Sequence, residues 1–91
     1  MEQEKNYNSL KAKLEQDFTF PLLYMFKFIV PSDNRKIALV SNLFDENAEI
    51  SLKASKKGTF TSITIRTVMI SAEEIIQKYK QAAEIEGLMA L

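Results

Sequence analysis

Hydrophobic and polar side chains alternate between Ile50 and Val68, and this alternation predicts two strands joined by a tight turn. The turn segment, residues 55–58, ends in Gly58, which supplies the positive φ that a short hairpin turn needs. A period of two is typical of a sheet with one buried face. The side chains expected to point inward are Ile50, Leu52, Ile63 and Ile65. Those expected to point outward are Ser51, Lys53, Ser62, Thr64 and Arg66.

A short helix and an aromatic strand are expected before this hairpin. Residues 1–8 are polar and are expected to be frayed, whereas Leu10, Leu14 and Phe18 recur at every fourth position and predict a helix from residue 9. Phe20-Pro21 ends this helix, because proline disfavours the helical conformation of the residue before it.

The strand is expected over residues 24–30, which are mostly aromatic or aliphatic. Its inner face carries Tyr24, Phe26, Phe28 and Val30. Its outer face carries Met25, Lys27 and Ile29, because a charged side chain marks the solvent side.

Two further helices follow from capping signals. Ser32 or Asp33 can cap a helix whose apolar stripe is Ile37, Val40, Leu43 and Phe44. Ser71 and Glu74 have the spacing of a capping box, in which the Glu74 carboxylate reaches back to the cap. The second helix is expected to end near residue 83, with these side chains inward: Ile75, Ile76, Tyr79, Ala82 and Ala83. Residues 88–91 are expected to form a small apolar terminal strand.

After the first helix, the expected order of elements is β-α-β-β-α-β. This order predicts an α+β, ferredoxin-like sandwich, in which two helices cover one face of a four-stranded antiparallel sheet and the other face stays open. We expect residues 1–17 to form a polar segment with a short helix, and residues 18–91 to form one ferredoxin-like domain.

The composition removes several classes of function. The 91 residues include no cysteine and no histidine, so disulfides, thiolate or imidazole metal sites and imidazole-based catalysis are absent. Twelve basic and twelve acidic residues cancel, which does not favour nucleic acids or anionic membranes. No apolar run is long enough for a membrane span and no signal segment is evident, so we expect a cytoplasmic protein without metal or cofactor.

Three segments of the chain resemble the YbeD-like family of small bacterial proteins of unknown function. They are Phe20-Pro21 with the aromatic strand and Lys27 behind it, the turn 55–58 with the strand 60–65, and the apolar end 89–91, so the resemblance covers residues 18–91. It implies an ACT-like, ferredoxin-type fold, similar to regulatory domains that bind amino acids or sense metabolites. A link to lipoate metabolism is inferred for the family, and no catalytic residues are established. ACT domains often bind their ligand near a glycine after the first strand, whereas residues 30–33 here are Val-Pro-Ser-Asp, which argues against an amino-acid site at that edge.

Basic side chains on the open face and at the turn are candidates for binding an anion. Lys27 and Arg66 come from strands that are adjacent in a ferredoxin-like sheet and could converge on a carboxylate or phosphate, with Lys53 on the same face. Lys56 and Lys57 could form an anion-binding corner at the turn. The alternative for all five is an ordinary solvated surface of lysines and cross-strand ion pairs.

Apolar side chains on the same face indicate a different use. Met25, Ile29 and Val68 would leave a patch suited to a protein partner or a homodimer, and the short terminal strand could pair with another chain. RNA binding is less favoured. Residues 57–61 begin like an RNA-recognition strand, but we expect Thr59 and Thr61 at the stacking positions and Phe60 on the opposite phase.

These observations favour a non-enzymatic regulatory or binding module of ACT-like type that senses a small anionic metabolite through its open sheet face. The alternative is a protein–protein interaction or homodimerisation module with no small-molecule ligand. An enzyme is disfavoured, because only Lys, Tyr, Ser and carboxylate side chains remain for chemistry.

Overall fold

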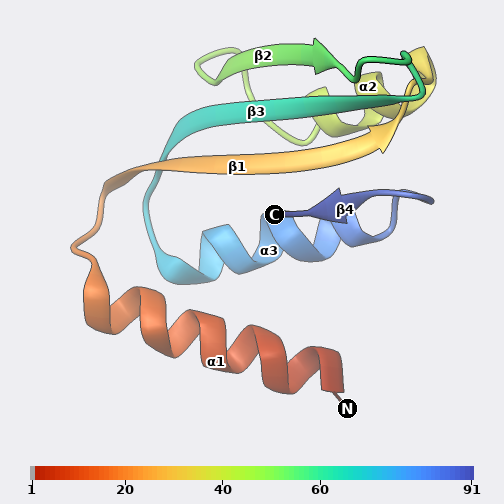
Figure 1. The fold of residues 1–91 in the computed structure, drawn as a ribbon. Coiled ribbons are helices and arrows are strands. Elements are labelled where there is room, and N and C mark those ends of the chain that lie inside the picture. The colour runs from red at the N-terminus through yellow and green to blue at the C-terminus, as the bar shows by residue number, and fades with distance from the viewer. Residues whose placement is uncertain (1) are drawn as a thin grey trace.

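The computed structural model describes the backbone of residues 2–91 and the side chains from residue 7 onward. Three helices and four strands follow one another along the chain (Figure 1). Their bounds are α1 Glu2–Asp17, β1 Leu22–Pro31, α2 Asn34–Ser41, β2 Glu49–Ala54, β3 Phe60–Met69, α3 Ala72–Ala83 and β4 Met89–Ala90. After α1 the order is the predicted β-α-β-β-α-β, and the predicted α+β class is confirmed.

The strands form one antiparallel sheet in the order β2-β3-β1-β4, so that β1 and β3 are central and β2 and β4 are edges (Figure 1). In the β1–β3 ladder, Phe26 lies opposite Ile65 and Phe28 opposite Ile63. The inward and outward phases expected for residues 24–30 and 62–66 are therefore those of the structure.

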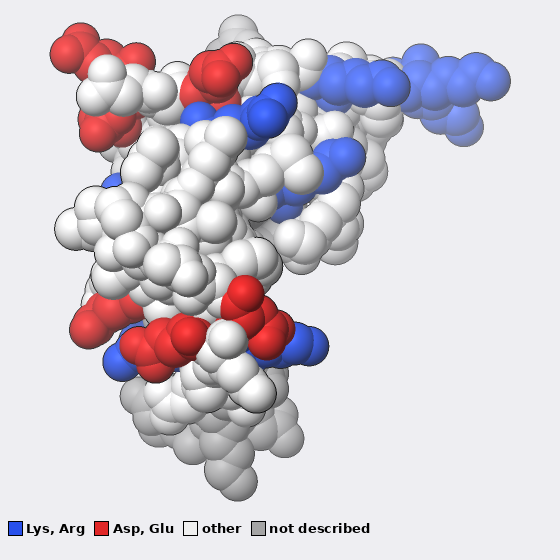
Figure 2. All heavy atoms as spheres, turned by 90° about the vertical axis from the view of Figure 1, so that its left-hand side faces the viewer, with Lys and Arg blue, Asp and Glu red and all other residues white. Residues whose placement is uncertain are grey.

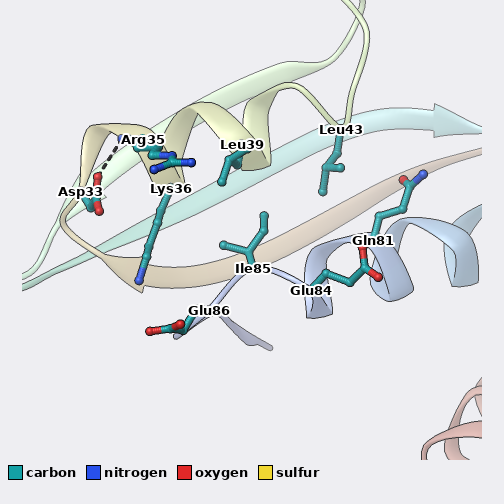
Figure 3. A pocket seen from close by; sticks show the side chains of 9 residues that line it. All are labelled: Asp33, Arg35, Lys36, Leu39, Leu43, Gln81, Glu84, Ile85 and Glu86. Atoms are coloured by element: carbon teal, nitrogen blue, oxygen red, sulfur yellow. Dashed lines mark hydrogen bonds between the residues drawn. The ribbon is translucent and has the colours of Figure 1, made fainter.

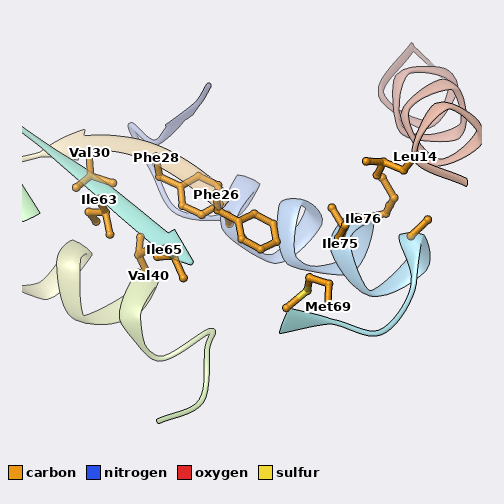
Figure 4. Close-up of a cluster of buried hydrophobic side chains, with 12 residues drawn as sticks. Leu14, Phe26, Phe28, Val30, Val40, Ile63, Ile65, Met69, Ile75 and Ile76 are labelled. Carbon is orange, nitrogen blue, oxygen red and sulfur yellow. The ribbon is translucent and has the colours of Figure 1, made fainter. Parts of the chain in front are cut away.

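The core lies between the inner face of the central strands and the helices. Phe26, Phe28, Ile63 and Ile65 are completely buried, and they pack with Val40 of α2 and with residues of α3 (Figure 4). The rings of Phe26 and Phe28 stack with their centroids 5.9 Å apart. Large aromatic and branched side chains supply most of the favourable free energy of such a core.

β2 differs from the prediction in its burial. Ile50 lies opposite Ile65 and Leu52 opposite Ile63, so both side chains are on the expected inner face of the sheet. Both are nevertheless exposed, by 38% and 53%, like the rest of β2. The expectation that they are buried is wrong, because the helices pack over the central strands and leave the β2 edge uncovered.

The first helix is longer than the sequence pattern indicates. It begins at Glu2, so the expected fraying of residues 1–8 is wrong for the described part of that segment. Leu14 is buried in the core, and Tyr7 and Leu10 pack against it. Phe18 lies beyond the helix end and is 47% exposed, so it does not continue the stripe.

Capping side chains begin both later helices. Asp33, and not Ser32, caps α2 by accepting a hydrogen bond from the Arg35 backbone N–H at 2.8 Å. The Ser71 hydroxyl accepts from the Glu74 N–H at 3.1 Å, as predicted. The Glu74 carboxylate accepts from the Ile70 N–H at 3.0 Å, one residue before the expected partner.

The ends of α2 and β4, and the burial at the end of α3, differ from those expected from the sequence. α2 ends at Ser41, so Leu43 and Phe44 pack against the core from the segment that follows the helix. Ala83 is exposed at the end of α3, although its neighbour Ala82 is buried. The terminal strand pairs through only two residues, Met89 and Ala90.

Both glycines adopt a positive φ. Gly58 has φ +76° in the hairpin turn, which confirms the role expected from the sequence. Gly87 has φ +82° after α3, where a Cβ atom would lie 3.0 Å from Cγ of Pro31. The peptide bond between Phe20 and Pro21, which follows α1, is cis.

Candidate functional site

The open face of the sheet carries the side chains that alternate with the core. Across the three longer strands, Lys53 of β2, Ser62 of β3 and Ile29 of β1 lie side by side. One row further along, Ser51, Thr64 and Lys27 do the same. Charged and small polar side chains thus alternate with apolar ones on a face that no helix covers (Figure 1).

A shallow hollow of about 340 Å³ lies at the hairpin end of this face. Its basic lining comes from three separate segments, because Lys27 belongs to β1, Lys53 to β2 and Lys56 to the turn. We call it the lysine hollow, and its remaining lining residues are Ile29, Ala54, Ser55, Phe60 and Ser62. The structure therefore brings together three of the five basic residues that the sequence singled out.

The other two basic candidates lie outside the lysine hollow. Lys57 is exposed in the turn and does not line it. Arg66 is on β3, adjacent to β1 as expected, but it lies opposite Met25 on one side and Glu49 on the other. Opposite charges at directly paired cross-strand positions attract one another, so we expect Arg66 to be less available to an anionic ligand than the three lysines.

Charge is unevenly distributed over the surface. In Figure 2, Lys and Arg side chains gather on one side of the upper part of the molecule and Asp and Glu side chains on the other, and the middle of the view is largely uncharged. In Figure 1, this upper part contains β2, β3 and α2. Twelve basic and twelve acidic residues give no net charge. Any attraction of an anion therefore depends on this local accumulation of positive charge.

Phe60 is a lining residue that the sequence pattern assigned to the wrong phase. The buried neighbour Thr61 points to the helix side, and Phe60 lies on the open face, 44% exposed and beside the lysines. The signal for this position was present, because Ser62 and Thr64 were expected outward and Phe60 shares their parity. The Ser55 hydroxyl accepts from the Phe60 N–H at 3.1 Å and holds the two together.

The apolar candidates lie at both ends of the open face. Ile29 lines the lysine hollow, whereas Met25 and Val68 lie towards the other end, where Val68 faces Leu23 across the ladder. Leu23, Met25 and Val68 are each more than half exposed. Met25 and Val68 therefore lie with Leu23 and apart from Ile29, and the use of these side chains as a contact for a partner stays a prediction.

Two larger grooves carry none of the residues predicted for a site. One, of about 540 Å³, lies between α2 and the segment that follows α3 (Figure 3). Acidic and basic side chains line it together, among them Asp33, Lys36 and Glu86, so it does not select for one sign of charge.

The other groove, of about 630 Å³, runs between α1, α3 and the chain end. In it the hydroxyl groups of Tyr24 and Tyr79 share a hydrogen bond of 2.8 Å. Burial, with this bond and the proximity of Tyr24 as smaller causes, raises the pKa of Tyr79 well above its usual value. A phenol held in its neutral form stabilises the core, and it is a poor base or nucleophile.

Among the side chains that the structure describes, residues 7–91, no group of three or more acidic side chains is placed to hold a metal ion. None of the helices described over residues 2–91 has the length and apolar character needed to cross a membrane. In the lysine hollow, the groups that could act on a ligand are ammonium and hydroxyl groups, which bind anions by donating hydrogen bonds.

Comparison with known proteins identifies the family of this chain and gives no activity for it. A family model described as "Protein of unknown function (DUF493)" matches residues 15–91. The chain belongs to the DUF493 family. This confirms the resemblance to YbeD-like proteins that the sequence motifs indicate.

Relatives of this DUF493 protein occur in several Shewanella species under the name UPF0250 protein. Those from Shewanella piezotolerans and Shewanella halifaxensis are 36% and 34% identical to it over 83 residues, which are 87% of this chain and 94% of theirs. The relative from Shewanella frigidimarina is 35% identical over the same coverage. No solved structure matches the chain significantly. The family is uncharacterised, so any activity must be inferred from the site itself.

Proposed function

We propose that this protein is a non-enzymatic regulatory or binding module that binds a small organic anion in the lysine hollow. The observation that supports this proposal is the meeting of Lys27, Lys53 and Lys56, from two strands and a turn, around one hollow. Lysines on separate segments have no structural need to converge, since each could extend into solvent alone.

The chemistry of the hollow fits a carboxylate or phosphate attached to an apolar body. Each ammonium group can donate up to three hydrogen bonds, and the hydroxyl of Ser62 adds one more donor. Phe60 and Ile29 provide the apolar part of the lining. A volume of about 340 Å³ is at the lower end of the range for small-molecule sites, which suits a ligand of metabolite size.

Absence of catalysis is part of the proposal. Catalysis of most group transfers needs a nucleophile with a nearby base, and the lysine hollow offers exposed lysines and serines without a histidine or a facing carboxylate. Binding and release of an anion, with a resulting change in the sheet surface, is the function that these groups support best.

Thermal unfolding with a panel of ligands tests the proposal. The panel comprises amino acids, nucleotides, lipoate and related carboxylates, each at about 1 mM. A ligand with a dissociation constant near 10 μM should stabilise the protein by about 2.7 kcal/mol, which raises the melting temperature by about 10 to 20 °C. A flat panel would contradict the proposal and favour a protein-interaction module that has no small-molecule ligand.

A matched set of variants locates the site. Lys27→Gln, Lys53→Gln and Lys56→Gln each remove a charge from the lysine hollow, and each should weaken the binding of the ligand found by about tenfold. Lys57→Gln removes a charge from the same turn without touching the hollow and should leave the affinity within about twofold. Equal effects of all four variants would indicate a diffuse electrostatic attraction and no site in the hollow.

A further inference from the structure

The β2 edge of the sheet has free backbone groups and uncovered apolar side chains. β2 pairs with β3 on one side only (Figure 1), and every residue of the strand is exposed. Ile50 and Leu52 lie on the helix side of the sheet but have no helix above them. A strand in this state is a template for pairing with another strand.

The hydrogen-bonding phase of β2 shows which residues face outward along this edge. The Ser55 N–H donates to the Phe60 carbonyl at 2.7 Å, in line with the β2–β3 register. Hydrogen-bonded and non-bonded pairs alternate in an antiparallel ladder, so the odd-numbered residues of β2 bond to β3. The N–H and C=O groups of Ile50 and Leu52 therefore point away from the sheet.

The sequence of β2 is complementary to itself when it is reversed. With Ser51 placed opposite Ser51 of a second copy, Ile50 lies opposite Leu52, and Glu49 lies opposite Lys53. We propose that two copies of this chain associate through antiparallel β2–β2 pairing in this register, with Ser51 on the two-fold axis. The two sheets would then join into one continuous sheet of eight strands.

Three independent requirements agree in this register. The hydrogen-bonded pairs between the two copies must join even-numbered residues. Ile50 and Leu52 form such a pair on each side of the two-fold axis. The side chains of Ile50 and Leu52 from the two copies meet on the helix side of the sheet, where those of one copy cover those of the other. The charged side chains meet on the open face as two Glu49–Lys53 pairs of opposite sign.

Other registers lose at least one of these features. A shift by one residue places apolar side chains opposite polar ones and turns the two sets of helices to opposite faces. A shift by two residues keeps the faces but places Lys53 opposite Ser51 or Asn47, and both charge pairs are lost. A lysine on an edge strand ordinarily discourages pairing, and in the proposed register Glu49 removes that obstacle.

The contact is confined to one short strand with the side chains beside it. Interfaces below about 1,200 Å² belong to weak or transient complexes, so we expect a dimer that forms only at high protein concentration. The pairing needs no ligand, because its groups are backbone atoms and strand side chains; one of them, Lys53, also lines the lysine hollow. The two experiments below are therefore made without added anions.

A cysteine cross-link tests the two-fold axis. The chain has no cysteine, so Ser51→Cys introduces a single thiol into each copy. In a non-bonded antiparallel pair the two Cα atoms are about 4.5 Å apart, which is within the range of a disulfide. Under mild oxidation Ser51→Cys should form a covalent dimer. The control Thr64→Cys, in the row beside it on β3, should stay largely monomeric. Equal cross-linking of the two variants would overturn the proposal.

Charge reversal tests the register by sedimentation over a concentration series. Glu49→Lys and Lys53→Glu each place like charges opposite one another twice, so each should self-associate about tenfold more weakly than the original chain. An equimolar mixture of the two variants should associate again, because each then faces the opposite charge. The double variant that carries both changes should also recover. If the mixture associates no better than either variant alone, or if the original chain is monomeric throughout, the proposal is wrong.

Discussion

Replacing Gly87 by alanine should destabilise the fold far more than replacing the chain's other glycine, Gly58. Both residues have a positive φ, +82° and +76° respectively, so an added Cβ atom strains the backbone about equally at the two sites. Their surroundings differ. A Cβ atom at Gly58 has no heavy atom within 4 Å, whereas one at Gly87 would lie 3.0 Å and 3.2 Å from Cγ and Cδ of Pro31.

The magnitudes follow from these distances. A non-glycine residue in the left-handed region costs about 1 to 2 kcal/mol, and the stiffer unfolded chain returns about 0.4 to 1 kcal/mol. Gly58→Ala should therefore lower the free energy of unfolding by about 1 kcal/mol. The proline ring cannot rotate away as a flexible side chain would, so Gly87→Ala adds an overpacking cost of about 1 to 3 kcal/mol.

Thermal unfolding and urea unfolding of the two variants, both followed by circular dichroism, measure the difference directly. Melting temperatures should fall by about 4 to 8 °C for Gly58→Ala and by about 10 to 25 °C for Gly87→Ala. The slope of the urea dependence should stay unchanged, so that the midpoints report stability alone. If the two variants are equally stable, the close approach of Pro31 to Gly87 does not constrain the fold.

Two further measurements probe the helix side of the sheet. The pKa of Tyr79 is raised in the folded protein, so above pH about 10 the folded protein keeps the phenol proton that the unfolded chain loses. Tyr79 therefore contributes stability below pH about 10, and this contribution declines as the pH rises further. Tyr79→Phe should flatten that alkaline decline in unfolding experiments, and an unchanged decline would refute the role of Tyr79. Leu14→Ala should lower the free energy of unfolding by about 2 to 5 kcal/mol, because Leu14 is only 4% exposed. Glu15→Ala, on the exposed side of α1, should lower it by less than about 0.5 kcal/mol. If the two substitutions lower the free energy of unfolding by similarly small amounts, α1 does not unfold together with the rest of the domain.

Local patterns predicted the parts of the fold that local physics controls. The period of two placed Ile63 and Ile65 on the inner face, and a turn that needs a positive φ identified Gly58. The Ser71 cap followed from a spacing of three residues. Each of these features depends on neighbours within a few positions of the chain.

The exposure of the β2 edge could not be predicted in the same way. Alternation assigns Ile50 and Leu52 to a face, but burial depends on where α2 and α3 lie above that face, and this is decided by packing between distant segments. The lysine hollow also depends on how segments that are distant in the sequence come together. Lys27 and Lys53 are 26 positions apart in the sequence and meet only because β1 and β2 flank β3.

The strand order also determines when each strand can find its partner as the chain is synthesised. The β1–β3 ladder joins residues that are between 29 positions apart, for Pro31 and Phe60, and 47 positions apart, for Leu22 and Met69. At about 5 to 20 residues per second, β1 waits about 1.5 to 9 s for its central neighbour to emerge. During that time its aromatic face, with Phe26 and Phe28, has no sheet to join. The topology therefore leaves this apolar strand unpaired, and open to contacts with other chains, for several seconds of each round of synthesis.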